Sequence, residues 1–342
     1  MPFYLWVVLG LGLGGADTGA AMKANLAVAT AVALGITYVH RHYTFILVYG
    51  DQGTFSRRRR AFIVAPFVAL GVIAALRGLN HLGVRMEAFP TVNPWAVALV
   101  AVGAWNIWHT IMQRYGILRV YAGRAGGGLQ AHEHARRDLA LLWSSVALVA
   151  TMAIVFRPET FLAVGNGRKT IAVAEWLLGG GGRWALVASV AAVVGVVAVR
   201  WVRHELRAPL AWTIRRPRLL FLTSTLALLA IFVIHGPIVG YLCFGVAHAL
   251  EYVAFVHHFG ERKFGGDPAN VGLVARWMRR PWIFGPLISL VLVAAFLVLF
   301  DSRKTDAFLI YYTATSTLHF LYDGWIWKVR TPAVARPLGV TS

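Results

Sequence analysis

The chain has 342 residues, of which 58% are hydrophobic and only 14% are charged. Its mean hydropathy is +0.64, and several apolar runs reach the roughly 20 residues that a helix needs to cross a lipid bilayer. The single cysteine, Cys243, excludes an intramolecular disulfide and any cysteine-based zinc or iron–sulfur cluster. The sequence therefore predicts an all-α, polytopic integral membrane helical bundle that forms one domain over residues 1–342.

The balance of charge is strongly basic, with a formal net charge of +19 from 33 Lys and Arg against 14 Asp and Glu. Nucleic-acid binding is one interpretation of such a balance. The basic residues, however, fall in the short segments between apolar runs, as the positive-inside rule expects of a membrane protein. We therefore expect no nucleic-acid partner, a location in the inner (cytoplasmic) membrane of the cell, and both termini in the cytoplasm.

About ten transmembrane helices follow from the apolar runs. The first is expected from Phe3 to about Gly14, and the second from about Met22 to Tyr49. The next five are expected over 61–79, 94–115, 138–156, 184–202 and 219–234. An eighth helix follows the turn at His235–Pro237, and the last two cover 282–300 and 307–327. The basic segments after the second, fourth, sixth and eighth helices all fall on one side, which gives the orientation.

Four of these helices carry histidines in apolar surroundings, where a polar side chain is costly unless it is paired, hydrogen-bonded or bound to a ligand. A rise of 1.5 Å per residue places three of the histidines roughly 8–12 Å from the cytoplasmic helix ends and a fourth at about 16 Å. These are His42, His109 and His319, and then His248. The even-numbered helices are thus expected to direct imidazoles to one layer in the inner half of the bilayer.

Helical geometry also indicates which polar residues share a face. In the eighth helix His248, Glu251 and Tyr252 do so, and in the tenth Asp323 lies on the face of His319. Residues two apart, such as His40 and His42, point about 200° apart on a regular helix, so only one of them is expected to reach a common site. The adjacent His257 and His258 point about 100° apart and present the same difficulty.

Imidazole and carboxylate ligands without thiolate suit iron, copper, zinc or manganese. Glu251 and Asp323 are candidate catalytic residues that would bridge metal ions or orient the imidazoles, and Tyr252 would donate hydrogen bonds or protons. So many ligands exceed what one tetrahedral zinc requires, which leaves room for two ions. The candidate metal ligands are His40, His42, His109, His248, His257, His258 and His319.

In residue type and depth, this set is similar to the histidine clusters of integral-membrane di-iron hydroxylases and desaturases, although the chain lacks their repeated HxxxH and HxxHH boxes. The similarity implies a non-haem iron oxidoreductase, with one or two ions, that acts on a lipid-like substrate and so belongs to lipid metabolism. Its partners would be the bilayer, the hydrophobic substrate and a cytoplasmic or membrane electron donor. Two alternatives stay open. One is a haem-binding electron-transfer protein, with haem held by a pair such as His109 and His319, and the other is a metal- or proton-coupled transporter.

Overall fold

A computed structural model describes residues 2–13, 20–84, 93–124, 128–156, 179, 181–207, 212–265, 272–328 and 331–340. The regular elements in these ranges are all helices, as predicted. The chain divides into two compact units. Unit 1 consists of residues 1–30, 111–245 and 339–342, and unit 2 consists of residues 31–110 and 246–338. The single domain expected from the sequence stays a prediction, and each unit is described by itself.

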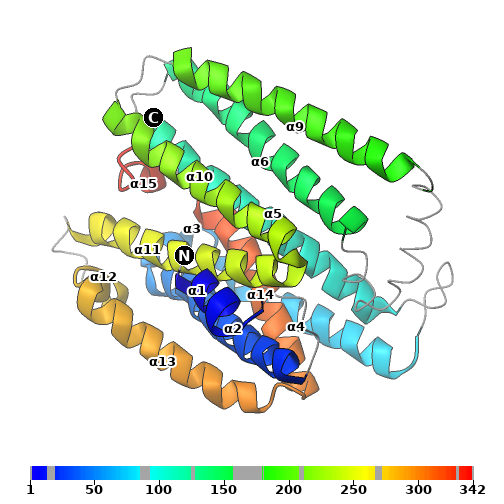
Figure 1. Cartoon of the computed structure of the whole chain (residues 1–342). Helices are drawn as coiled ribbons and strands as arrows, with labels where there is room; N and C mark the ends of the chain where they lie inside the picture. The colour runs from blue at the N-terminus through cyan, green and yellow to red at the C-terminus, as the bar shows by residue number, and fades with distance from the viewer. Residues whose placement is uncertain are drawn as a thin grey trace. The chain divides into compact units, whose positions relative to one another are not determined.

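Unit 1 begins with α1 (Pro2–Leu5) and the short π-helix η1 (Trp6–Gly10). Its main helices are α6 (Gly128–Phe156), α9 (Gly182–Arg207) and α10 (Trp212–Ile234) (Figure 1). It also includes the beginning of α2 (Ala20–Gly50), the end of α5 (Pro94–Arg124) and the beginning of α11 (Gly236–Gly265). Within this unit, α6 packs against both α9 and α10.

Unit 2 takes residues 31–50 of α2, 94–110 of α5 and 246–265 of α11. The long helices that belong wholly to it are α4 (Arg59–His81), α13 (Pro281–Asp301) and α14 (Asp306–Ile326). Three short helices complete it, namely α3 (Gln52–Arg57), α12 (Leu273–Met278) and α15 (Pro332–Ala335). α14 packs against α4, and buried side chains of α2, α11, α12 and α13 form an apolar core.

Eight helices of the described chain are long and apolar enough to cross a membrane, which confirms the expected polytopic helical bundle. They are α2, α4, α5, α6, α9, α10, α11 and α13. The side of the membrane on which the termini lie stays a prediction.

Two of the ten expected spans do not meet these criteria. The segment predicted as a first membrane helix forms only α1 and η1, which end at Gly10 and are too short to cross roughly 30 Å of hydrocarbon. Gly14 lies outside the described residues. α14 has 21 residues, which is long enough, but it is less apolar because it carries Thr, Ser, His and Asp side chains.

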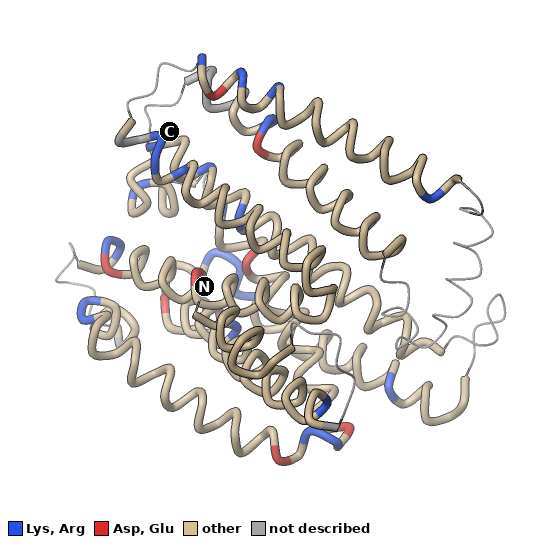
Figure 2. The backbone as a smooth tube through the Cα atoms, viewed as in Figure 1, with Lys and Arg blue, Asp and Glu red and all other residues tan. Residues whose placement is uncertain are grey.

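The predicted basic loop between the fourth and fifth expected helices is largely helical. α5 continues beyond residue 115 to Arg124, and α6 already begins at Gly128. Arg119, Arg136 and Arg137 therefore lie on helices, which is consistent with the good helix propensity of arginine. Figure 2 shows most Lys and Arg positions near helix ends, with long uncharged stretches between them.

Buried charges link the three main helices of unit 1. The Arg218 guanidinium on α10 donates to Asp138 Oδ1 on α6 at 2.5 Å and also to the Glu205 carboxylate on α9. Trp201 Nε1 donates to the same Asp138 oxygen at 2.8 Å. Because Arg218, Asp138 and Glu205 are all buried, each charge depends on the others for the solvation it has lost.

Candidate metal centre

Five buried side chains from four helices of unit 2 converge in one place. They form two overlapping groups of three residues, and within each group the possible ligand atoms lie within 4.8 Å of one another. One group is His40, His248 and His319, and the other is His109, His319 and Asp323. All five residues are buried, with at most 6% of their surface exposed. We call this set the candidate metal centre; it consists of His40 on α2, His109 on α5, His248 on α11, and His319 and Asp323 on α14.

The two closest imidazoles have the separation expected of ligands on one ion. His40 Nε2 and His319 Nε2 lie 3.1 Å apart, and their rings are nearly perpendicular. Two nitrogens that are each about 2.1 Å from a metal lie about 3.0 Å apart when they subtend a right angle at it. The pair therefore has the geometry of adjacent ligands as well as that of a hydrogen bond.

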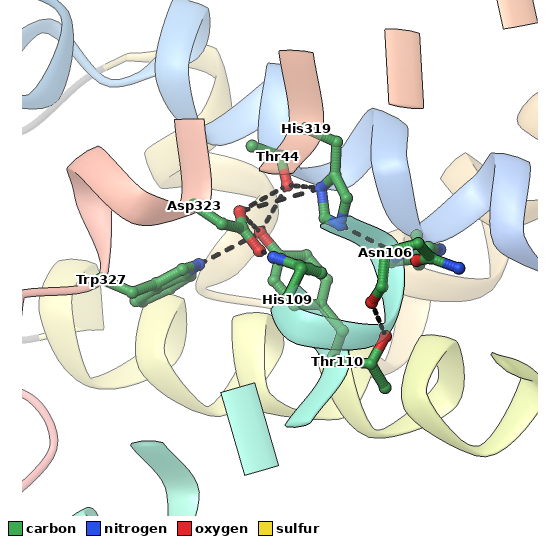
Figure 3. Close-up of polar contacts among 9 residues, drawn as sticks. Thr44, Asn106, His109, Thr110, His319, Asp323 and Trp327 are labelled. Atoms are coloured by element: carbon green, nitrogen blue, oxygen red, sulfur yellow. Dashed lines mark hydrogen bonds and ion pairs between the residues drawn. The ribbon is translucent and has the colours of Figure 1, made fainter. Parts of the chain in front are cut away.

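A second pair faces inward without a hydrogen bond. His109 Nε2 and Asp323 Oδ2 are 3.8 Å apart, and both atoms are buried with no hydrogen-bond partner among the described residues. Figure 3 shows the His109 ring directed toward the Asp323 carboxylate. Buried polar atoms are almost always satisfied in folded proteins, so the space between these two atoms could hold an ion or a water molecule. A separation of 3.8 Å is compatible with two ligands on one ion that subtend an angle of about 130°.

Thr44 and Tyr252 hold the carboxylate in position. Thr44 Oγ1 donates to Asp323 Oδ1 at 2.9 Å, and the Tyr252 hydroxyl donates to the same oxygen at 2.8 Å. Both donors are buried. Because they occupy only Oδ1, the other carboxylate oxygen is left to face His109.

The same threonine sets the tautomer of His319. Thr44 Oγ1 lies 2.7 Å from His319 Nδ1. Since the Thr44 hydroxyl proton is used on Asp323, its oxygen must accept from an Nδ1–H of His319. The lone pair of His319 is then on Nε2, the nitrogen that faces His40. Metal-bound histidines are commonly oriented by such a hydrogen bond at the second ring nitrogen.

One further residue, Trp327, supports the Tyr252 hydroxyl. Trp327 Nε1 donates to the Tyr252 hydroxyl oxygen at 3.2 Å, and Figure 3 shows Trp327 directed at this network. Tryptophans near the ends of membrane helices commonly act as aromatic anchors at the membrane surface. The indole nitrogen of Trp327 instead belongs to the hydrogen bonds around Asp323.

The remaining candidate ligands predicted from the sequence lie elsewhere. His42 uses both ring nitrogens, on the Tyr38 carbonyl at 2.7 Å and on the Tyr311 hydroxyl at 2.9 Å. His257 Nε2 lies 3.0 Å from the Tyr43 hydroxyl.

His258 is exposed and Glu251 is half-buried, and neither belongs to the two groups of ligand atoms among the described residues. As helical geometry predicts, only one member of the His40–His42 pair points inward.

The sequence analysis did not identify Thr44 as a site residue, although its spacing from His40 could have indicated it. Thr44 follows His40 by four residues, so the two side chains share one face of α2. It also missed the buried Arg41, whose guanidinium lies 3.8 Å from the centre of the Tyr312 ring. Arg41 donates to the Tyr312 carbonyl at 2.9 Å and to Ser316 Oγ at 2.5 Å, and so ties α2 to α14.

No family model, curated protein or solved structure matches this chain. What can be said of its chemistry therefore rests on its own residues. They form a multi-pass, membrane-type helical protein with a buried cluster of histidines that could bind a metal ion.

Proposed function

We propose that this protein is a membrane-bound, non-haem iron oxidoreductase that uses the candidate metal centre to activate oxygen on a hydrophobic substrate. The observation that carries the proposal is the convergence of imidazoles from four helices on one buried point, with His40 Nε2 and His319 Nε2 3.1 Å apart. Ionisable side chains within apolar helices are rare, and they mark functional sites when they cluster.

The contacts of His319 favour one ion over two. Both groups of ligand atoms include this residue, and its Nδ1 is already engaged by Thr44. Only Nε2 is left as a ligand, so His319 serves a single ion. That ion would have up to four imidazole nitrogens and one carboxylate oxygen as protein ligands.

This ligand set suits iron. Imidazole with carboxylate, and no thiolate, is typical of non-haem iron sites, whereas structural zinc is usually satisfied by four ligands. Five protein ligands leave one position of an octahedral ion open for oxygen or substrate. Bound iron would supply one-electron chemistry and oxygen activation.

The protein's own groups have distinct parts in this proposal. Asp323 offers Oδ2 as a ligand while Thr44 and Tyr252 hold Oδ1. The Tyr252 hydroxyl lies next to the ligand carboxylate and is the group best placed to deliver a proton to the reacting centre. Burial of the site keeps water away, which strengthens each electrostatic interaction there.

The shape of the cluster argues against haem. The imidazole centroids of His40, His109, His248 and His319 lie 4.6–5.3 Å from their neighbours. This spacing accommodates an ion but not a flat macrocycle between the rings. Copper, zinc, and metal or proton transport are the other outcomes that the test below separates. The inner membrane as location, a lipid-like substrate and a cytoplasmic or membrane electron donor belong to the same proposal.

The test is metal analysis of the full-length protein purified in a mild detergent, together with its optical and electron paramagnetic resonance spectra. We expect about one iron per chain, no Soret band, and a ferrous form that is reoxidised by oxygen. A Soret band, a stoichiometric content of zinc or copper, or a chain that takes up no iron would each overturn the proposal.

A further inference from the structure

Unit 2 contains a pocket of about 200 Å³ beside the ends of several helices. The last turns of α2, α11 and α14 contribute to its wall, together with α3 and the first turn of α4. Lys328, Thr331, Ala333 and Val334 complete the lining. None of the ligand residues of the candidate metal centre lines it. Its chemistry therefore calls for a separate explanation.

The pocket is positively charged. Its single acidic lining residue, Asp51, is bound by Lys263 and by Thr54. Burial alone would raise the pKa of Asp51, but the hydrogen bonds from Lys263 and Thr54 outweigh it and hold the pKa below its usual value. Asp51 is therefore ionised and neutralises Lys263. The other lining cations, Arg57, Arg58 and Lys328, are exposed and have no acidic partner among the described residues.

The other part of the wall is aromatic and aliphatic. Trp325, Trp327, Phe62 and Phe259 all line the pocket. The Trp327 and Phe259 rings pack edge to face with centroids 5.0 Å apart, and the Arg58 guanidinium lies 5.6 Å from the centre of the Trp325 ring. One cavity thus offers cations for an acidic group and an apolar wall for a hydrocarbon chain.

Trp327 also connects the pocket to the candidate metal centre. It lines the pocket, and its Nε1 donates to the Tyr252 hydroxyl, which in turn donates to Asp323. Two hydrogen bonds, through Trp327 and Tyr252, therefore link the wall of the pocket to the carboxylate of the candidate metal centre.

We propose that this pocket binds an amphiphile with an acidic head group, a phosphate or carboxylate, held by Arg57, Arg58 and Lys328 with its chain against Trp325 and Trp327. That this amphiphile is the substrate of the metal centre rests on the proposed function; that it binds here does not. Cations that only anchor helices at a membrane surface need no pocket, whereas Arg57, Arg58 and Lys328 line one together with two tryptophans.

The experiment is native mass spectrometry of the full-length protein in a neutral maltoside detergent, titrated with dodecyl phosphate, dodecanoate or dodecanol. We expect one dodecyl phosphate or dodecanoate per chain and no stoichiometric binding of dodecanol, which lacks the charge. Inorganic phosphate should not displace dodecyl phosphate at equal concentration, because the chain contributes to binding. Equal binding of dodecanol, or displacement by inorganic phosphate, would overturn the proposal.

Matched variants locate the binding. Arg58→Gln with Lys328→Gln should weaken dodecyl phosphate binding at least about tenfold, because charge-assisted contacts are lost. The control, Arg303→Gln with Lys304→Gln, removes the same charge from exposed positions outside the pocket and should bind as the parent does. Equal weakening in both variants would show a non-specific charge effect and overturn the assignment.

Measuring iron-free and iron-loaded protein keeps the two proposals distinguishable. A chain that binds dodecyl phosphate but no iron would retain the pocket and overturn the oxidoreductase. A chain that binds iron but no dodecyl phosphate would retain the metal centre and overturn the proposal for the pocket.

Discussion

His40 and His319 are 279 positions apart in the sequence, yet their Nε2 atoms lie within 3.1 Å. Polar contacts at several levels align the two helices that carry them. Thr37 Oγ1 lies 3.1 Å from the Tyr312 hydroxyl, Arg41 donates to Ser316, and Thr44 donates to Asp323. These contacts fix the register of α2 against α14, and this register places the imidazoles of His40 and His319 opposite each other.

Replacement of His40 by alanine should remove most bound iron, because it deletes one of the two closest ligands of the proposed ion. We expect metal content below about a tenth of the parent value, since loss of a direct ligand exceeds the 10–100-fold cost of losing only a supporting contact. Metal analysis of the purified variant measures this.

The matched control for this experiment is His42→Ala on the same helix. His42 is only two residues away, but its ring nitrogens contact Tyr38 and Tyr311 instead of the cluster. The His42→Ala variant should therefore keep its iron. Equal loss in both variants would mean that α2 tolerates no histidine replacement, and the ligand assignment would then be contradicted.

The sequence predicted most of the helices, and it singled out the four helices whose histidines converge in the candidate metal centre. It did so because apolar runs set helix length and because buried histidines stand out against them. It could also narrow the pair His40 and His42 to one inward residue, since a helix turns by about 100° per residue. Which of the two faces inward depends on the helix that packs against α2, and no local pattern contains that information.

The buried ion pairs of Arg218 with Asp138 and Glu205 in unit 1 could not be predicted from the sequence either. Asp138 was interpreted as the first residue of a membrane helix next to a basic loop. The structure instead places it within α6, ten residues after the helix begins, where Arg218 on α10 binds it. Pairing between distant charges depends on tertiary packing, which charge patterning along a sequence does not specify.

Thr44→Val tests the supporting hydrogen bonds without touching a ligand. Valine has nearly the same shape, but it cannot accept from His319 Nδ1–H or donate to Asp323. We expect iron affinity to fall about 10–100-fold, as is typical when an oriented ligand loses its partner. Competition with a soluble iron chelator measures the change.

Thr44→Ser is the informative companion variant. Serine keeps the hydroxyl and removes only a methyl group, so it should retain iron affinity within a few-fold of the parent. If valine and serine weaken iron binding equally, packing rather than hydrogen bonding explains the role of Thr44.

Arg218→Gln should destabilise unit 1 severely. The substitution leaves the carboxylates of Asp138 and Glu205 buried without their principal counter-charge. Breaking a buried ion pair by removing one partner typically costs about 3–5 kcal/mol. The unfolding midpoint in detergent, followed by circular dichroism, should drop accordingly.

Arg203→Gln provides the reference for that measurement. Arg203 is an exposed residue of α9, two positions before Glu205, and surface substitutions of this kind usually change stability by less than about 0.5 kcal/mol. A midpoint for Arg218→Gln that matches the one for Arg203→Gln would refute the structural role of the network.

The contact between Asp51 and Lys263 should make stability depend on pH. Hydrogen bonds from Lys263 and Thr54 outweigh the effect of burial and lower the pKa of Asp51 in the folded chain. A carboxylate with a lowered pKa stabilises the fold fully above its unfolded pKa of about 3.9, and that contribution is lost as the pH falls through the folded value. The parent should therefore be more stable than Asp51→Asn at neutral pH, and the difference between their unfolding midpoints should shrink as the pH is lowered below about 4. Asp51 also caps α3, because its side chain accepts a hydrogen bond from the backbone N–H of Thr54. A difference that stays constant over this range would show that Asp51 contributes through its shape and this cap, and not through its charge.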